Sequence, residues 1–226
     1  MKPSVKLAAF PFFRETKRLD NAAVGGPLKR SFDIVVATLG LFILSPLFIM
    51  LGFLIKMSDG GPVFYGHRRI GCGGQPFYCL KFRTMKTDGD AILESFLREN
   101  PQARQEWQTA RKLQSDPRVT DVGAVIRKLS LDELPQLLNI LRGEMSIVGP
   151  RPVVLEELEL YGPAAAYYLR SRPGLTGVWQ ISGRNNVSYD KRVAFDQRYV
   201  ENWSFRGDVA IILKTIPAVC AARGSY

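Results

Sequence analysis

The longest apolar stretch of the chain runs from Ile34 to Ile55 and contains no charged residue. A helix over this stretch would reach about 33 Å, close to the thickness of a bilayer core. The pattern therefore predicts a membrane helix. A cleaved signal peptide fits less well, because the stretch is long, begins late and lacks a clear small-residue cleavage site.

Two features complicate a simple span. Ser45-Pro46 lies in the middle of the stretch, where a proline removes a backbone hydrogen bond and favours a kink. Basic residues stand on both sides, such as Lys29-Arg30 before it and Arg68-Arg69 after it, so the positive-inside rule selects no orientation. Two alternatives remain open from the pattern: a spanning helix, or a re-entrant helix that is broken at Ser45-Pro46 and keeps both flanks on one face.

A β-hairpin is predicted directly after the membrane stretch. Residues 62–65 and 75–82 are aromatic, β-branched or alternating, and the glycine-rich segment 71–74 suits a tight connection between them. The expected fold class is therefore α+β, mainly helical, with one small hairpin sheet.

The apolar spacing predicts helices in most of the remaining chain. These helices are expected over residues 90–113, 122–129, 153–171 and 189–202, with a further one after Ser130. The segment 209–222 is apolar except for Lys214, but it is too short to span a bilayer. We expect it to form an amphipathic helix in the membrane interface.

The composition narrows the classes of partner. The 226-residue chain carries a net charge of +10, which points to nucleic acid, nucleotides, phosphorylated substrates or an acidic membrane face. The membrane stretch and the lack of a nucleic-acid-reading motif argue against nucleic acid. The three cysteines form no CxxC, so neither a disulfide framework nor a structural zinc site is expected.

Candidate chemistry centres on Asp132-Glu133. Because the chain has one histidine, His67, acid–base or nucleophilic work is expected to fall to carboxylates. The structural alternative is a capping box, with Ser130 at the N-cap and Glu133 reaching back. Pro135 within the first turns favours Asp132 as the cap instead. In both cases the helix end would favour an ionised carboxylate, which could attack a bound phosphate beside a divalent cation.

Five basic residues stand next to turns, prolines or strand ends: Lys81, Arg83, Arg118, Arg127 and Arg151. A guanidinium matches phosphate oxygens bidentately, although each of these charges alone also fits a solvated surface position. Pro150 and Pro152 restrict where Arg151 points. No Walker loop or Gly-x-Gly-x-x-Gly is present, so a standard nucleotide-binding fold is not supported.

As an ordered set, several blocks make the chain resemble a known family over residues 28–226. The blocks are Lys29-Arg30-Ser31-Phe32-Asp33, Ser45-Pro46, Gly61-Pro62-Val63-Phe64, Lys81-Phe82-Arg83-Thr84-Met85, Asp116-Pro117-Arg118, the run from Arg127 to Gln136, Gly149-Pro150-Arg151-Pro152 and the run from Arg172 to Gly177. The family is that of the bacterial sugar transferases, the monotopic polyprenyl-phosphate phosphoglycosyl transferases. Within it the chain most resembles the rhizobial exopolysaccharide galactose-1-phosphate transferases.

The resemblance implies a reaction. The donor would be a UDP-sugar and the acceptor undecaprenyl phosphate, with Asp132 attacking the β-phosphate, expelling UMP and forming a covalent intermediate. Mg²⁺ would be held by Asp132 and Glu133, with Glu133 either a metal ligand or a base. Arg127 would lie near the lipid phosphate. The phosphate and nucleotide region would be lined by Lys81, Arg83, Arg118 and Arg151.

The resemblance also implies an organisation and a location. It favours the re-entrant helix over the spanning one. We expect a basic N-terminal arm over 1–28, a re-entrant helix over 29–58 and a catalytic domain over 59–226 at the cytoplasmic face of the bacterial inner membrane. Membrane lipid is an expected partner, and further copies of the chain or polysaccharide-assembly proteins are possible ones. The role of residues 90–115 stays open.

Two other functions fit the residues taken without the resemblance. One is a membrane-bound glycosyltransferase that releases UDP, and the other is a non-enzymatic membrane adaptor.

Overall fold

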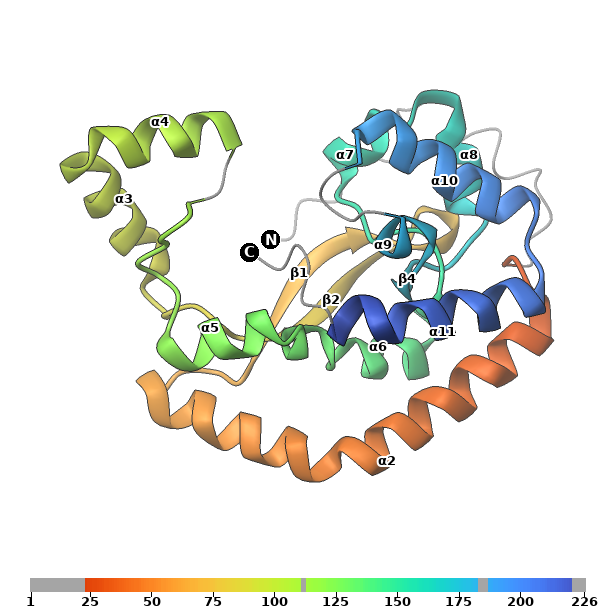
Figure 1. Cartoon of the computed structure of the whole chain (residues 1–226), viewed down its shortest axis with the longest axis horizontal. Coiled ribbons are helices and arrows are strands. Elements are labelled where there is room, and N and C mark those ends of the chain that lie inside the picture. Colours follow the sequence, from red (N-terminus) through yellow and green to blue (C-terminus); the bar gives the residue numbers. More distant parts are fainter. Residues whose placement is uncertain (1–22, 111–112, 183–186, 221–226) are drawn as a thin grey trace.

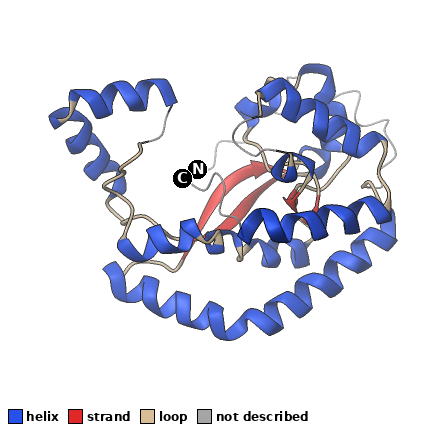
Figure 2. Ribbon diagram, viewed as in Figure 1, coloured by secondary structure: helices blue, strands red, loops and turns tan. Residues whose placement is uncertain are grey.

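The protein is mainly helical with two small sheets, which confirms the predicted α+β class (Figure 2). A computed structural model describes residues 23–110, 113–182 and 187–220. The long helix α2 (Gly26–Asp59) lies along one side of the molecule, and α3 (Gly89–Glu99) and α4 (Pro101–Ala110) project at one end (Figure 1).

Helix α2 is continuous through Pro46, so the predicted break at Ser45-Pro46 is wrong, and the helix bends near its middle instead (Figure 1). The hydroxyl of Ser45 donates a 2.8 Å hydrogen bond to the carbonyl oxygen of Phe42. This is the carbonyl that the missing N–H of Pro46 leaves without its helical donor. The serine hydroxyl therefore satisfies it and lets the helix continue at a bend.

One face of α2 packs on the body of the protein from end to end, most tightly near its two ends, whereas the outward face is exposed. Near the N-terminal end, Lys29 and Asp33 are buried. Near the C-terminal end, Leu51 and Ile55 are buried in one hydrophobic cluster with Phe82 and others. Between them the side chains of Phe42, Ile43 and Ile49 are largely exposed. The helix is long and apolar enough to cross a membrane, and its outward face carries exposed apolar side chains along its length.

The predicted hairpin is confirmed. Strand β1 (Phe64–Ile70) pairs antiparallel with β2 (Pro76–Phe82), and a short 3-10 turn over 72–74 connects them. The first strand is longer than predicted, because its pairing continues as far as Ile70 opposite Pro76. This register places Tyr65 opposite Lys81 and His67 opposite Cys79.

Two predicted helices are each divided by a local signal. The segment 90–113 forms α3 and α4, with Asn100 extended between them because the residue before Pro101 disfavours helical dihedrals. The segment 153–171 forms α7 (Leu155–Glu159) and α8 (Ala165–Leu169), separated by a turn at Gly162-Pro163. Both single-helix predictions were therefore wrong.

Other helices agree more closely with the predictions. Helix α5 (Asp121–Lys128) has Thr120 as its N-cap, and α10 (Tyr189–Glu201) matches the predicted segment 189–202. The final helix, α11 (Phe205–Cys220), begins before the predicted segment 209–222 and keeps exposed apolar side chains at Leu213 and Ile216.

A second sheet was not predicted. Strand β3 (Ser146–Val148) pairs in parallel with β4 (Gly174–Thr176), and helix α9 (Val178–Ile181) follows β4. Directly after β3, the backbone of Gly149 lies close to the backbone of Arg172 and Gly174. A Cβ on Gly149 would overlap the carbonyl oxygen of Arg172 and the backbone of Gly174. The two glycines allow this contact, which brings the segment 149–152 beside the segment 172–179.

Candidate active site

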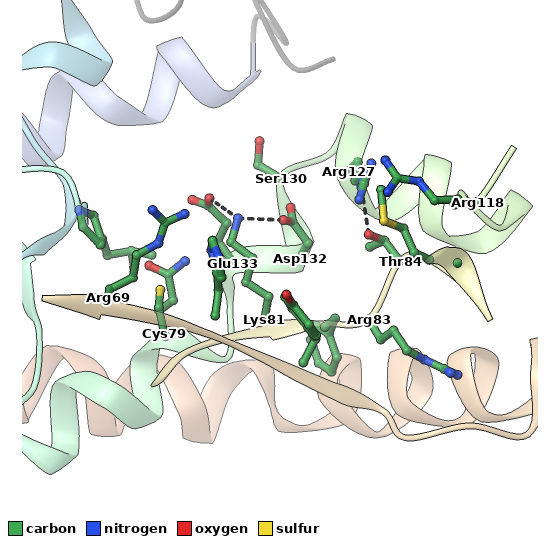
Figure 3. A pocket seen from close by; sticks show the side chains of 18 of the residues that line it. Arg69, Cys79, Lys81, Arg83, Thr84, Arg118, Arg127, Ser130, Asp132 and Glu133 are labelled. Carbon is green, nitrogen blue, oxygen red and sulfur yellow. Dashed lines mark hydrogen bonds and ion pairs between the residues drawn. The ribbon is translucent and has the colours of Figure 1, made fainter. Parts of the chain in front are cut away.

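Lys81 of β2 lies between the two candidate carboxylates. Its ammonium nitrogen is 3.2 Å from an oxygen of Asp132 and 2.8 Å from an oxygen of Glu133 (Figure 3). The three predicted residues are therefore brought together, with one cation shared by two carboxylates. Both acidic residues come from a 3-10 turn, η3 (Leu131–Glu133), that precedes α6 (Gln136–Arg142).

The predicted capping box is absent. Ser130 has a left-handed backbone with φ 55°, and its side chain makes no capping hydrogen bond. Glu133 bonds to Lys81 rather than reaching back, and α6 begins only at Gln136 with Pro135 at its N-cap. Asp132 is not the N-cap either. The left-handed residue turns the chain so that the carboxylates face β2.

Asn139 of α6 holds the turn η3 against the hairpin. Its side-chain carbonyl accepts a 2.9 Å bond from the backbone N–H of Leu80, and its amide donates a 2.8 Å bond to the carbonyl of Tyr78. Asn139 is fully buried. Through these two hydrogen bonds the side chain of Asn139 pairs with the backbone of β2. The contact places η3 next to Lys81.

Arg127 and Arg118 lie beyond the end of β2. The guanidinium of Arg127 donates a 2.7 Å bond to the hydroxyl of Thr84, as Figure 3 shows. The backbone of Thr84 accepts the N–H of Thr120, and an isolated bridge joins Met85 to Val119. These contacts bring both arginines to the carboxylate side of the cleft.

Arg83 lies in a different environment from the other predicted basic residues. Its guanidinium pairs with Asp59 at the C-terminal end of α2, and in Figure 3 it points away from Asp132. Its side chain is about one-tenth exposed. Arg83 therefore ties the hairpin to α2 as well as bordering the cleft.

Arg151 approaches the cleft from the opposite side. It follows β3 in the segment 149–152, and its guanidinium carbon lies 4.8 Å from the ring centre of Trp179 on α9. An isolated bridge between Ile70 and Val153 holds this segment at the end of β1.

All seven predicted site residues line one cavity of about 790 Å³, so the structure gathers positions from 81 to 151 into one cleft. Sequence reasoning missed several other lining residues, among them Tyr65, His67 and Arg69. Their alternate spacing on β1 would have placed them on one face, because side chains in a strand alternate between its two sides. Trp179 and Gln180 also line the cleft and follow an unpredicted strand, so no comparable signal marked them.

The charges of the cleft are strongly coupled. Burial raises the pKa of Asp132, and the neighbouring Lys81 ammonium opposes that rise without cancelling it. Burial works to lower the pKa of Lys81, but the charges of Glu133 and Asp132 outweigh it and raise the pKa. Lys81 therefore stays a cation, and the ionised form of Asp132 depends on that cation rather than on a helix end.

The carboxylate pair fits a partial site for a divalent cation. Both carboxylates already converge on a single positive group, Lys81, within 3.2 Å. No group of three or more His, Cys, Asp or Glu residues suited to a metal occurs in residues 23–110, 113–182 and 187–220. Mg²⁺ is commonly held by one or two carboxylates together with substrate phosphates, so a phosphorylated ligand would have to complete this site.

Comparison with known proteins identifies relatives along the whole chain. Residues 24–222 match the family model described as bacterial sugar transferase. The chain is 64% identical to the exopolysaccharide production protein ExoY of Rhizobium meliloti, over 100% of both chains. It is 52% identical to the undecaprenyl-phosphate galactose phosphotransferase of Salmonella typhimurium, over 88% of this chain and 42% of that protein.

A more distant relative carries a different sugar in its name. The UDP-glucose:undecaprenyl-phosphate glucose-1-phosphate transferase of Caulobacter vibrioides is 36% identical, over 89% of this chain and 76% of that protein. The family match and the full-length identity confirm the family resemblance that the sequence indicated. The chain belongs to the bacterial sugar transferase family.

Proposed function

We propose that this protein transfers a sugar-1-phosphate, galactose-1-phosphate, from a UDP-sugar to undecaprenyl phosphate and releases UMP. This would be the first membrane step of exopolysaccharide repeat-unit synthesis. The observation that carries the proposal is the half-buried Asp132 held against Lys81 in a cleft lined by basic residues, beside a long apolar helix that packs on the same body at both ends.

The proposed chemistry proceeds in two displacements at one phosphorus atom. A carboxylate oxygen of Asp132 attacks the β-phosphorus of the donor, the bond from that phosphorus to the bridging oxygen breaks, and UMP leaves with that oxygen. A phosphate oxygen of undecaprenyl phosphate then attacks the same phosphorus and displaces Asp132. The product is undecaprenyl diphosphate carrying the sugar, and the carboxylate is regenerated.

The basic residues support this chemistry through charge. Lys81 is placed to keep Asp132 ionised and to bind a phosphate oxygen, and Arg127, Arg118 and Arg151 border the same cavity. Preorganised positive groups stabilise the charge that builds up during transfer. Glu133 and Asp132 would hold Mg²⁺ against the diphosphate, and the cation would reduce the repulsion between carboxylate and phosphate.

The helix arrangement supports a re-entrant position in the inner membrane, with the cleft at the cytoplasmic face. Both ends of α2 contact the domain that carries the cleft, so the two ends are expected on one side of the bilayer. The exposed apolar face of α2 would enter the lipid, and apolar side chains on α11 would lie in the interface. A lipid-borne phosphate would then arrive at the membrane side of the cleft.

The choice of galactose follows the named relatives. The galactose phosphotransferase is 52% identical to this chain, whereas the glucose-1-phosphate transferase is 36% identical.

The test is to trap the covalent intermediate. Purified protein incubated with UDP-galactose carrying a labelled sugar phosphate, without acceptor, should retain the label on Asp132 and release UMP. Asp132→Asn should lose both signals, whereas Asp121→Asn, at an exposed position of α5, should keep them. Release of UDP instead of UMP would indicate a glycosyltransferase. Normal polysaccharide production by Asp132→Asn in cells would indicate an adaptor.

A further inference from the structure

Two arginines that line the cleft each lie against a tryptophan. The guanidinium carbon of Arg118 is 5.1 Å from the ring centre of Trp107, and that of Arg151 is 4.8 Å from the ring centre of Trp179. A cation over an aromatic face is attracted by the ring, more strongly where water is excluded. The two pairs differ in what else holds the arginine.

Arg118 has a second and stronger support. Asp116 accepts two hydrogen bonds from its guanidinium, at 2.8 and 2.6 Å. Such a bidentate ion pair fixes both the position and the plane of the guanidinium. The orientation of the Arg118 guanidinium therefore does not depend on Trp107.

Arg151 has no equivalent carboxylate among the residues that the structure describes. Within that part of the chain its guanidinium makes no ion pair or hydrogen bond, and it lies against the indole face of Trp179. Asp196 of α10 accepts a hydrogen bond from the backbone of Arg151 and attracts its guanidinium charge, but forms no ion pair with it. The direction of the guanidinium is thus set largely by the ring.

Trp179 is itself firmly placed by packing. It is 7% exposed, and the guanidinium of Arg192 on α10 lies 5.4 Å from its ring centre. Its ring nitrogen is buried and has no hydrogen-bond partner among the described residues. The aromatic face, rather than the N–H group, is therefore what this residue contributes.

We infer that Trp179 is a positioning residue that holds the Arg151 guanidinium in the cleft for the diphosphate of the donor. The inference rests on the proposed function for the identity of that anion. Trp179 acts through Arg151 and not by contacting the reacting atoms. Removing the ring should release the guanidinium and weaken the capture of the donor more than the chemical step.

The experiment measures KM and kcat for UMP release from UDP-galactose in a set of variants. Trp179→Leu should raise KM by roughly 3- to 30-fold, the range that a partly desolvated cation–π contact supports, with a smaller change in kcat. Trp179→Phe should stay close to wild type, because it keeps an aromatic face and loses no hydrogen bond. The matched variant Trp107→Leu should change KM by less than about twofold, because Asp116 still holds Arg118.

A double-mutant cycle separates positioning from a structural role. If Trp179 acts through Arg151, then Trp179→Leu should have little further effect on KM in an Arg151→Ala background. Additive effects in the double variant, or an unchanged KM in folded Trp179→Leu, would overturn the inference. Thermal unfolding of each variant shows whether it is folded.

Direct binding of UDP, measured by calorimetry on the same proteins, keeps the two proposals separate. A wild-type protein that binds UDP but releases no UMP would refute the transferase reaction. The double-mutant cycle, with UDP affinity as its readout, would then still test the role of Trp179. A wild-type protein that releases UMP, with equal UDP affinity in Trp179→Leu, would refute the inference alone.

Discussion

Lys29 and Asp208 form a buried ion pair, 2.5 Å apart, between the first turn of α2 and the first turn of α11. Their residues are 3% and 1% exposed. Asp208 also accepts hydrogen bonds from the hydroxyl of Tyr199 at 2.8 Å and the ring nitrogen of Trp203 at 3.1 Å. This pair fastens the long apolar helix α2 to α11.

Replacing Lys29 by methionine should lower the free energy of unfolding by about 3 kcal/mol, because it leaves a buried carboxylate without its cation. The two neutral donors that remain on Asp208 keep the loss at the low end of the usual range. Denaturation in detergent micelles, followed by tryptophan fluorescence, measures the change. Lys56→Met, at an exposed position of the same helix, should stay within about 0.5 kcal/mol of wild type. Equal losses in both variants would contradict a special role for the pair.

The anchored ends of α2 predict that both termini of the protein lie on the same face of the membrane. Tags placed at residue 1 and at residue 226 should both be protected from protease in sealed right-side-out vesicles. Both should become accessible when the vesicles are inverted or opened. Exposure of a single tag in the right-side-out vesicles would show a spanning helix.

Asp196 predicts a dependence of stability on pH. Burial raises the pKa of this carboxyl to about 7, although the Tyr161 hydroxyl, donating at 2.8 Å, and Arg151 oppose that rise. The folded protein then holds a proton that the unfolded chain releases near pH 4. The stability contributed by that proton is complete below about pH 4 and is lost as the pH rises through 7, by at most about 1.4 kcal/mol per pH unit.

Asp196→Asn should remove this slope, since an amide cannot ionise but its oxygen can still accept the Tyr161 bond. The stability of the variant relative to wild type should therefore improve as the pH rises from 5 to about 7 and then level off, measured by denaturation at each pH. Asp190→Asn, an exposed position on the same helix, should give a difference that stays constant over this range. A constant difference for Asp196→Asn as well would refute the coupling.

Local patterns predicted the elements whose signals lie within a few residues. The alternating residues of β2 and the glycines at 71–74 indicated a hairpin, and the helical spacing before Glu201 indicated α10. The same kind of local signal was overlooked at Pro101 and at Gly162-Pro163, where single helices were predicted and two were found. Strands β3 and β4 are only three residues each and pair in parallel across 25 intervening residues, so no short-range pattern marks them.

The candidate site likewise combines residues that the sequence predicted with contacts that only the fold decided. The chain has 31 Lys and Arg and 21 Asp and Glu, and positions next to turns, prolines and strand ends, together with the family resemblance, selected Asp132, Glu133 and the five basic residues among them. Their roles toward one another depended on the fold. Local sequence favoured a cap for Ser130 and Glu133, whereas Asn139 docks α6 on β2 and turns Glu133 toward Lys81.

The sequence by itself determined that the chain has a long apolar helix with a proline near its middle, a hairpin and a set of basic residues suited to anionic ligands. These features depend on hydrophobicity, periodicity and charge type. Only the tertiary structure decided that both ends of α2 pack on one body, that Arg83 pairs with Asp59, and that Trp179 lies against Arg151. Each of these contacts joins positions at least 24 residues apart. Contacts at such separation arise from packing of whole elements, which no local pattern records.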